Sequence, residues 1–214
     1  MIQIQSKLPR DVIVACSGGV DSMAVVDFLC RNHNVAVAFF HHGTETSDIA
    51  RDFVAEYCSD KQLDFLYGNL GNASKPNRDS WEEYWRKERY KFFHGFNAPV
   101  VTAHHLDDCV ETWVWSSMHG TGKIIPFRNK NVVRPFLLNK KSKLQLWADL
   151  KGVSFVEDDT NKDVCYTRNY IRHEMMPNVL RVNPGIHKTI AKKVKDEYTA
   201  WSTIWHSKVR RTLF

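Results

Sequence analysis

A short glycine-rich turn is the first part of the sequence whose residue types could bind a ligand. Residues 17–22 (SGGVDS) follow an apolar run and precede a segment with helical periodicity. Glycines let the backbone approach a ligand closely, and amides at the start of a helix attract an anion. Serine hydroxyls add donors, and Asp21 can hold a divalent cation against phosphates. The turn predicts a phosphate site with a metal-binding carboxylate; the alternative is a serine–glycine turn that only caps a helix.

Histidines and carboxylates gather in a second segment, residues 104–112 (HHLDDCVET). If a helix begins near residue 105, His104, Asp108 and Glu111 share one of its faces. They could ligate a metal or orient a nucleophile, but repulsion between the carboxylates disfavours the cluster unless a cation compensates. Helix capping by Asp107 and Asp108 is the alternative. The segment lacks H-E-x-x-H and is therefore not a protease zinc helix.

Arginines form a third candidate group, in residues 85–90 (WRKERY). Arg86 and Arg89 are spaced i, i+3 on a predicted helix, where guanidinium groups could clamp phosphates or an RNA backbone. A surface pair between Glu82 and Arg86 is the alternative.

An acidic segment followed by a basic one forms the fourth candidate group. Residues 157–161 (EDDTN) precede Arg168 and Arg172, which share a helix face at i, i+4. The two arginines could reach a ligand, and structural salt bridges remain the alternative.

Strands that alternate with helices must position these groups. Short apolar runs predict strands, and runs with a 3.6-residue period predict helices. Strands are expected at residues 12–16, 35–40, 63–67, 99–103 and 132–134; helices are expected at 20–31, 47–60, 80–94, 107–118, 140–151, 167–176 and 186–206. Ser80 is a candidate N-cap, and Asn183-Pro184-Gly185 breaks the chain before the last helix. This order predicts an α/β fold: a Rossmann-like parallel sheet of about five strands with helices on both faces, plus a helical C-terminal segment.

The strand ends should bring the polar segments together. Right-handed crossovers place the carboxyl ends of parallel strands at one edge, where ligands bind. Residues 17–22, 41–43 (HHG) and 104–112 each begin where a predicted strand ends. We therefore expect them to meet, and we divide the chain into a catalytic domain, residues 1–138, and a basic helical extension, residues 139–214.

The charge of the 214-residue chain is uneven. Residues 1–109 contain 11 Lys and Arg against 15 Asp and Glu, whereas residues 110–214 contain 19 against 9. A basic half indicates a polyanionic partner, most simply nucleic acid. The five cysteines form no C-x-x-C pair and therefore support neither a disulfide framework nor a thiolate-held metal. Without an apolar run of ~20 residues or a secretory signal, a cytoplasmic protein without membrane contact is expected.

The motifs also occur in a recognisable order. The turn at residues 17–22 lacks the lysine of G-x-x-x-x-G-K-[ST] and resembles the PP-loop signature of enzymes that split ATP between its α- and β-phosphates. With FFHHG, WRKERY, TAHHLDDCVET, HGTG, VRP, EDDTN and RNYIR, it resembles the tRNA(Ile)-lysidine synthetases over roughly residues 10–182. The resemblance implies a PP-loop/adenine nucleotide alpha hydrolase-like fold and a ligase of tRNA modification.

The same resemblance implies a reaction and a set of residue roles. In that family the C2 oxygen of the wobble cytidine in a CAU anticodon attacks ATP, pyrophosphate leaves, and free L-lysine displaces AMP to give lysidine. ATP and Mg²⁺ are the implied cofactors, with Mg²⁺ on Asp21 and the ATP phosphates. Carried over by position, the nucleotide-binding residues are Ser17, Gly18, Gly19, Val20, Asp21, Ser22, His41 and His42. The implied catalytic residues are Asp21, His104, Asp108, Glu111, Arg86, Arg89 and Arg168.

Several alternatives stay open at this point. Members of that family usually continue into C-terminal domains, so a compact form that recognises tRNA(Ile) through its basic half is expected. A tRNA 2-thiolation enzyme is the nearest rival, although such enzymes commonly use cysteine pairs. A PP-loop amide synthetase and a nucleotide-binding protein without catalysis are the others. Trp201 and Trp205 fit a core or a subunit interface equally, which leaves a homodimer open.

Overall fold

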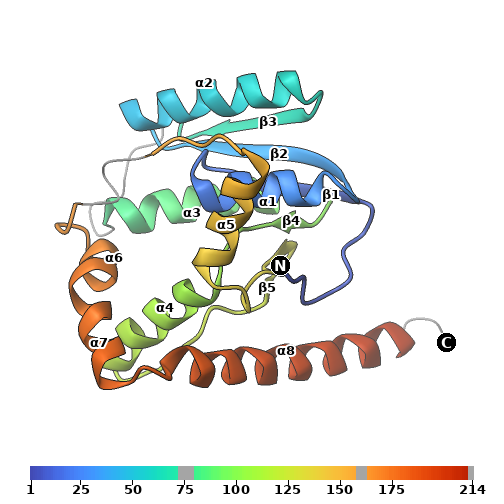
Figure 1. Ribbon diagram of the computed structural model, residues 1–214. Coiled ribbons are helices and arrows are strands. Elements are labelled where there is room, and N and C mark those ends of the chain that lie inside the picture. The colour runs from blue at the N-terminus through green and yellow to red at the C-terminus, as the bar shows by residue number, and fades with distance from the viewer. Residues whose placement is uncertain (72–79, 158–162, 212–214) are drawn as a thin grey trace.

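A six-stranded sheet forms the centre of the molecule (Figure 1). The computed structural model describes residues 1–71, 80–157 and 163–211, with the backbone alone for residues 200–211. The strands are β1 (Asp11–Ala15), β2 (Asn34–His41), β3 (Asp64–Asn69), β4 (Val100–Val101), β5 (Arg128–Asn129) and β6 (Val132–Val133). They lie in the order β3-β2-β1-β4-β6-β5, and only β5 runs antiparallel to its neighbour. The five predicted parallel strands are confirmed; β5 is an addition.

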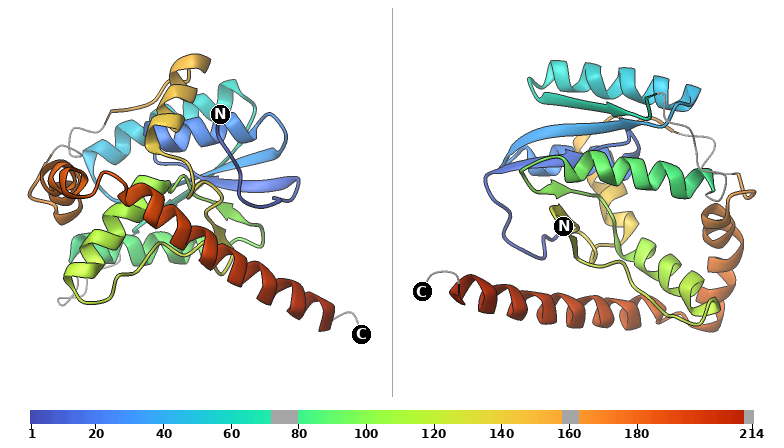
Figure 2. Two further views of the ribbon diagram at one scale, coloured as in Figure 1. Left: turned by 60° about the horizontal axis from the view of Figure 1, so that its bottom comes forward. Right: turned by 180° about the vertical axis from the view of Figure 1, so that it is seen from behind.

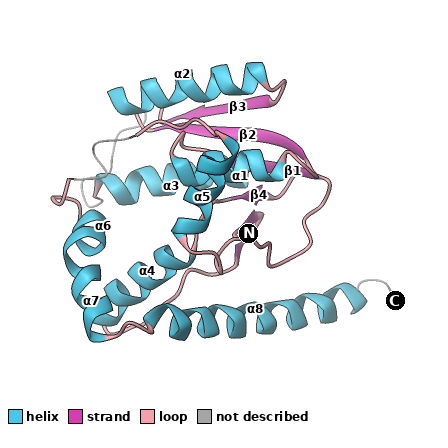
Figure 3. Cartoon of the chain, viewed as in Figure 1, coloured by secondary structure: helices cyan, strands magenta, loops and turns pink. Residues whose placement is uncertain are grey.

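Helices follow the strands as predicted, with small shifts at their ends (Figure 3). They are α1 (Val20–Leu29), α2 (Glu45–Asp60), α3 (Trp81–His94), α4 (Leu106–Met118), α5 (Lys141–Lys151), α6 (Thr167–Tyr170), the π-helical turn η2 (Ile171–Met175), α7 (Met176–Val182) and α8 (Ile186–Arg211). Ser80 caps α3 as predicted, because its hydroxyl accepts the Glu83 N–H at 3.1 Å. The helix expected at 167–176 instead continues to Val182, because Pro177 falls at the start of α7, where a missing N–H is tolerated.

Both faces of the sheet are covered, as the fold prediction requires. On one face α1, α2 and α5 pack in a core with the strands, through residues such as Val25, Val54 and Leu144. On the other face α3 packs against the strands through Tyr90 and Phe93. The predicted division between residues 138 and 139 remains a prediction, and α5, which lies beyond it, shares the core of the sheet.

A third packed layer lies beside the sheet and contains the last helices. Val110 and Val114 of α4 pack with Ile171, Ile186 and Ile190. The first part of α8 therefore lies against α4, and the helix then runs outwards from the body (Figure 2). No helix in residues 1–71, 80–157 or 163–211 is both long and apolar enough to cross a membrane. Residues 158–161 of the acidic segment and the side chains of Trp201 and Trp205 lie outside the described residues.

The strand order reverses next to β1, and this reversal creates the site. From β1 the chain builds outwards through β2 and β3, and it then returns to place β4 on the other side of β1. The loops that leave β1 and β4 consequently diverge, and ligands bind in the crevice between such loops. The segments after these two strands, residues 17–22 and 104–112, therefore face each other.

Candidate active site

The turn after β1 has a fixed shape that suits an anion. Gly18 adopts a φ of +83°, and a Cβ there would lie 3.4 Å from the Ala50 Cβ, so the position favours glycine. The Ser22 hydroxyl accepts the Ser17 N–H at 3.2 Å and donates to the Gly19 carbonyl at 2.8 Å. No side chain caps α1, whose first-turn amides have no intrahelical acceptor. Ser17 stays exposed, whereas Ser22 holds the turn together.

Asp21, in the first turn of α1, carries an unsatisfied carboxylate. Its Oδ1 is buried and has no hydrogen-bond partner among the residues that the structure describes, while Oδ2 lies 3.6 Å from His105 Nε2 and 3.9 Å from Lys141 Nζ. A buried oxygen without a donor is costly, and a bound cation removes that cost. No cluster of three or more His, Cys, Asp and Glu in the described parts of the chain could hold a metal. Asp21 therefore fits a Mg²⁺ that takes its other ligands from phosphates and water.

A cavity of about 240 Å³ lies between the turn and the segment that follows β4. Eight polar side chains in its wall were singled out by the sequence: Ser17, Asp21, Ser22, His42, Arg89, His104, Asp108 and Arg168. A second cavity of about 290 Å³ lies next to it, with Gly19, Ser47 and Glu157 in its wall, and shares Ser17 and His42. The predicted meeting of the three polar segments is confirmed.

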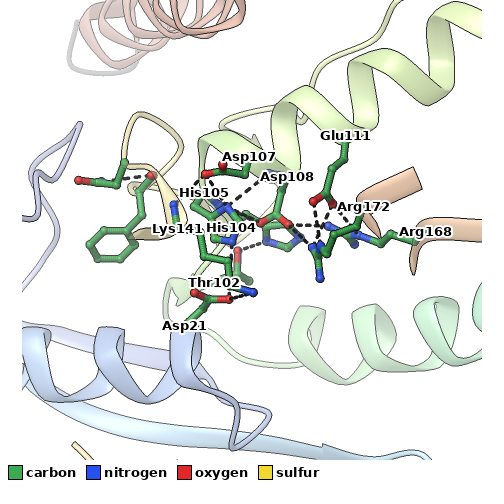
Figure 4. A network of polar contacts seen from close by, with 12 residues as sticks. Asp21, Thr102, His104, His105, Asp107, Asp108, Glu111, Lys141, Arg168 and Arg172 are labelled. Atoms are coloured by element: carbon green, nitrogen blue, oxygen red, sulfur yellow. Dashed lines mark hydrogen bonds and ion pairs between the residues drawn. The ribbon is translucent and has the colours of Figure 1, made fainter. Parts of the chain in front are cut away.

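The carboxylates of α4 face two arginines from α6 and η2 (Figure 4). Arg168 donates to Asp108 Oδ1 at 2.8 Å, and Arg172 Nη2 lies 3.3 Å from the same oxygen. Arg172 also holds both oxygens of Glu111, at 2.8 and 3.0 Å. The sequence indicated that this acidic cluster needs a cation; the cations are two guanidinium groups.

The cluster keeps Asp108 charged. Burial alone raises the pKa of Asp108, but His105 and Arg168 hold it well below its ordinary range. Burial lowers the pKa of Arg172, and its hydrogen bonds to Glu111 reverse that shift and raise it. A carboxylate with so low a pKa binds a cation well but accepts a proton poorly.

His104 and Arg89 both line the cavity, but the side chain of His104 is neutral and that of Arg89 is positively charged. The ring of His104 bonds through Nδ1 to the Thr102 hydroxyl at 2.8 Å, and burial lowers the pKa of His104 to about 3, which keeps it neutral. Burial, with Arg86 and Arg168 nearby, lowers the pKa of Arg89 to about 10, which keeps it charged. Within the described residues no carboxylate pairs with Arg89. In the described part of the chain, Arg89 is thus a cation in the cavity wall without a carboxylate partner.

Three of the ionisable side chains expected in the site, those of Arg86, His41 and Glu111, lie outside the wall of the first cavity. Arg86 is exposed and stacks over the Tyr90 ring at 4.7 Å, beside a separate hollow. His41 is buried, with Nε2 3.2 Å from Asp48 Oδ1, because adjacent residues at a strand end point in opposite directions. Glu111 lies one turn behind Asp108 on α4, where it contacts Arg172.

His105 is a site residue that the sequence reasoning missed. It is 1% exposed and caps α4. Burial alone lowers the pKa of His105, but Asp21 and the neighbouring carboxylates outweigh burial and raise it. Its Nδ1 accepts the Asp108 N–H at 3.3 Å, a contact that requires the neutral ring present above that raised pKa. The sequence could have indicated this role, because His105 directly precedes Leu106 and so falls at the N-cap position of α4.

Tyr90 and Arg134 are a second pair that the sequence reasoning passed over, although WRKERY and VRP contain them. Arg134 is 1% exposed and donates to the Tyr90 hydroxyl at 2.7 Å. Burial raises the pKa of Tyr90, but the guanidinium groups of Arg134 and Arg86 lower it overall. Tyr90 lies in the cavity wall, so the pair fixes a polar group there.

Named relatives match nearly the whole chain. A tRNA(Ile)-lysidine synthase of Lactiplantibacillus plantarum is 34% identical over 201 residues, covering 85% of this chain and 45% of that protein. The enzyme of that name from Thermotoga sp. (strain RQ2) is 32% identical, covering 86% and 48%. That of Parabacteroides distasonis is 32% identical, covering 92% and 48%. The chain thus spans about half the length of the curated relatives it matches.

Two further comparisons concern the domain itself. An NH3-dependent NAD synthetase from Campylobacter jejuni aligns with a TM-score of 0.47 at 15% identity, covering 90% of this chain and 87% of that one, a likeness too weak to inform fold or site. Residues 2–179 match the family described as the PP-loop domain. That match takes in the turn at residues 17–22, the α4 carboxylates and both arginines that face them, and the chain accordingly belongs to the PP-loop domain family.

Proposed function

We propose that the chain is a ligase that uses ATP and Mg²⁺ to join L-lysine to C2 of the wobble cytidine of a CAU-anticodon tRNA(Ile). The relatives that match most of it carry the name tRNA(Ile)-lysidine synthase. One observation carries the proposal: the anion-binding turn, Asp21 with its unsatisfied oxygen, and the Asp108–Arg168 pair border a single cavity. The turn would bind the nucleotide, Asp21 the metal ion and Asp108 the second substrate, so this cavity has a place for each.

In the first step, the C2 oxygen of the cytidine attacks the α-phosphate of ATP. The bond between the α- and β-phosphates breaks and pyrophosphate leaves, so C2 now carries AMP, a better leaving group than a carbonyl oxygen. The turn amides and the side chains of Ser17 and Arg89 are suited to hold phosphate oxygens. Asp21 would hold the Mg²⁺, which would supply positive charge against the negative charge that develops on the phosphates.

In the second step, the amine of lysine attacks C2 and expels AMP. Asp108 and Glu111 are suited to bind the ammonium group of lysine, since they already bind guanidinium groups. Arg168 is the cation more easily displaced, because its side chain is 48% exposed against 24% for Arg172. The low pKa of Asp108 makes it a poor proton acceptor, and we therefore assign it to binding rather than to deprotonation of the amine.

Recognition of the RNA is assigned to the basic half of the chain. The wobble base must leave the anticodon stack to enter the cavity. Exposed lysines on the described part of α8, at positions 188, 192, 193 and 195, offer a phosphate-binding surface. We infer that this surface supplies salt-dependent affinity, and a gel-shift titration that finds no tRNA binding even at low salt contradicts the inference.

The test is lysine transfer itself. The chain is incubated with ATP, Mg²⁺, radiolabelled lysine and a CAU-anticodon tRNA, and label on the RNA is measured together with AMP and pyrophosphate. We expect one AMP and one pyrophosphate per lysine incorporated. The matched control is the same tRNA with uridine at the wobble position, which should take no label. Pyrophosphate release without lysine incorporation contradicts the proposal.

The 2-thiolation alternative needs a sulfur carrier, and the cysteines do not favour one. All five are free; Cys16, Cys58 and Cys109 are buried. Burial raises the pKa of Cys58 and of Cys109 to about 12, so neither is a thiolate at neutral pH. Incorporation of sulfur rather than lysine into the tRNA would establish that alternative.

A further inference from the structure

The ring of His105 lies between the two acidic regions of the cavity and contacts both (Figure 4). Its side chain is 2% exposed, and each ring nitrogen faces a different element. Nδ1 lies at the start of α4 and Nε2 lies at the start of α1. No other side chain in the described parts of the chain joins Asp21 to Asp108 in this way.

The contact at Nδ1 fixes the proton of the neutral ring. The backbone N–H of Asp108 donates to His105 Nδ1 at 3.3 Å, and the backbone N–H of His105 donates to the Asp108 carboxylate at 3.0 Å. The two hydrogen bonds together form a capping box. Because Nδ1 accepts, the ring hydrogen is on Nε2. His105 is therefore an N–H donor on the side that faces Asp21.

The contact at Nε2 divides the two oxygens of Asp21. Oδ2 lies 3.6 Å from His105 Nε2, and its other cationic neighbour, Lys141 Nζ, is more distant at 3.9 Å and partly exposed. Oδ1 is buried and has no hydrogen-bond partner among the described residues. One oxygen thus lies beside a buried donor, and the other is left for a ligand.

We propose that His105 is a positioning residue, whose Nε2–H holds Asp21 Oδ2 so that Oδ1 is presented to the Mg²⁺ of the bound nucleotide. The inference rests on the proposed binding of Mg²⁺ and ATP, and on neither lysine nor tRNA. Partners that orient a metal-binding side chain typically change metal affinity by about 10- to 100-fold when they are removed. A role in capping α4 would explain the contact at Nδ1 but not the position of Nε2 beside Asp21.

Two substitutions separate the two nitrogens. Asparagine places its side-chain oxygen near the Nδ1 position, so His105→Asn keeps the cap and loses the contact to Asp21. Glutamine reaches the Nε2 position, so His105→Gln keeps a donor for Asp21 and loses the cap. Thermal unfolding reports the cap, and calorimetric binding of α,β-methylene ATP across a Mg²⁺ titration reports Asp21.

The positioning role predicts opposite behaviour of the two variants. His105→Asn should raise the Mg²⁺ concentration for half-maximal nucleotide binding about tenfold and change the unfolding temperature little. His105→Gln should lower the unfolding temperature by about 2–4 °C and leave the Mg²⁺ requirement near that of the unchanged chain. His33→Asn, at the opposite edge of the sheet, controls for the substitution itself. In an Asp21→Asn background, His105→Asn should add no further change.

A purely structural role predicts that both variants shift the Mg²⁺ requirement only as far as they lower stability. An unchanged requirement in His105→Asn, or a further shift in the Asp21→Asn background, overturns the inference about His105 alone. Absence of any Mg²⁺-dependent binding by the unchanged chain overturns the proposed function as well. The two failures are therefore distinguishable.

Discussion

Two acidic regions face each other across one cavity, and they differ in what already neutralises them. At the turn after β1, within the described residues, one oxygen of Asp21 has no hydrogen-bond partner and the other lies 3.6 Å from His105 Nε2. On α4, Asp108 and Glu111 contact two arginines at 2.8 to 3.6 Å. The first region is ready for an inorganic cation, whereas the second is built to hold organic ones. Residue type alone does not distinguish Asp21 from Asp108, since both are aspartates at the edge of a parallel sheet.

The difference follows from the elements that surround each carboxylate. Asp21 lies on the first turn of α1 beside amides that attract phosphate, so a metal there can share its ligands with a nucleotide. Asp108 and Glu111 are buried one turn apart on α4, and two buried like charges are stable only with close counter-charges. The helical segment from Thr167 to Met175 supplies them.

The largest expected effect comes from removing the open carboxylate. Asp21→Asn should lower ATP-dependent lysine transfer about 100- to 1,000-fold, because the Mg²⁺ that would offset the charge developing on the phosphates loses a charged ligand. Steady-state rates at several Mg²⁺ concentrations measure it. Asp52→Asn, an exposed position on α2, is the matched control and should leave the rate unchanged. If Asp108→Asn but not Asp21→Asn raised the Mg²⁺ requirement, the roles of the two regions would be reversed.

A large effect on stability is expected at the closed region. Arg172→Ala should lower the free energy of unfolding by about 3 kcal/mol, because it leaves Glu111 buried without its main partner. Arg168→Ala should cost about 1 kcal/mol, since half of its side chain is in solvent. Guanidinium denaturation measures both. Adding Glu111→Gln to Arg172→Ala should restore part of the loss; equal losses for the two arginine variants would show that the burial difference is immaterial.

A smaller effect should separate Arg89 from its neighbour on α3. Arg89→Ala should lower the ATP-dependent rate about tenfold, because Arg89 lines the cavity and no carboxylate of the described residues pairs with it. Arg86→Ala should change it less than about threefold, because Arg86 stacks over Tyr90 outside the cavity. The pair of rates, at saturating Mg²⁺, is the measurement. A larger loss for Arg86→Ala would place the phosphates on the other side of the helix.

A last prediction concerns pH and the neutral histidine beside the acid cluster. His104 has a pKa of about 3 when folded and about 6.5 when unfolded, so between these values the unfolded chain binds a proton that the folded chain does not. The free energy of unfolding should therefore fall as the pH drops from about 6.5 towards 3. In His104→Gln, about one proton fewer should be taken up on unfolding at pH 5. An identical pH dependence in the two proteins would place His104 in solvent.

Much of the fold could be predicted because its signals are local. Apolar runs such as residues 12–16 mark buried strands without reference to any partner. β5 was not predicted, because Arg128 and Asn129 carry no apolar pattern; they pair with β6 through the backbone. The packing of α5 against α1 also escaped, since its apolar face could have met any neighbour.

The sequence predicted where the site lies in the fold but not which side chains contact each other there. Strand order brings Asp21 and Asp108 to one edge, but the pairing of Asp108 with Arg168 joins positions 60 residues apart. Arg86 and Arg89 are three residues apart and project only about 60° from each other, so periodicity could not decide which one faces the cavity. His104 and His105 are neighbours whose directions depend on where α4 begins, at Leu106.

The central claim is that a metal binds at Asp21 and not at the α4 carboxylates. Crystals grown with Mn²⁺ and α,β-methylene ATP allow the ion to be located by its anomalous scattering. A peak within about 2.3 Å of Asp21 Oδ1, with Arg168 and Arg172 still on Asp108 and Glu111, is the predicted result. A peak between Asp108 and Glu111, with the arginines displaced and none at Asp21, would contradict the account.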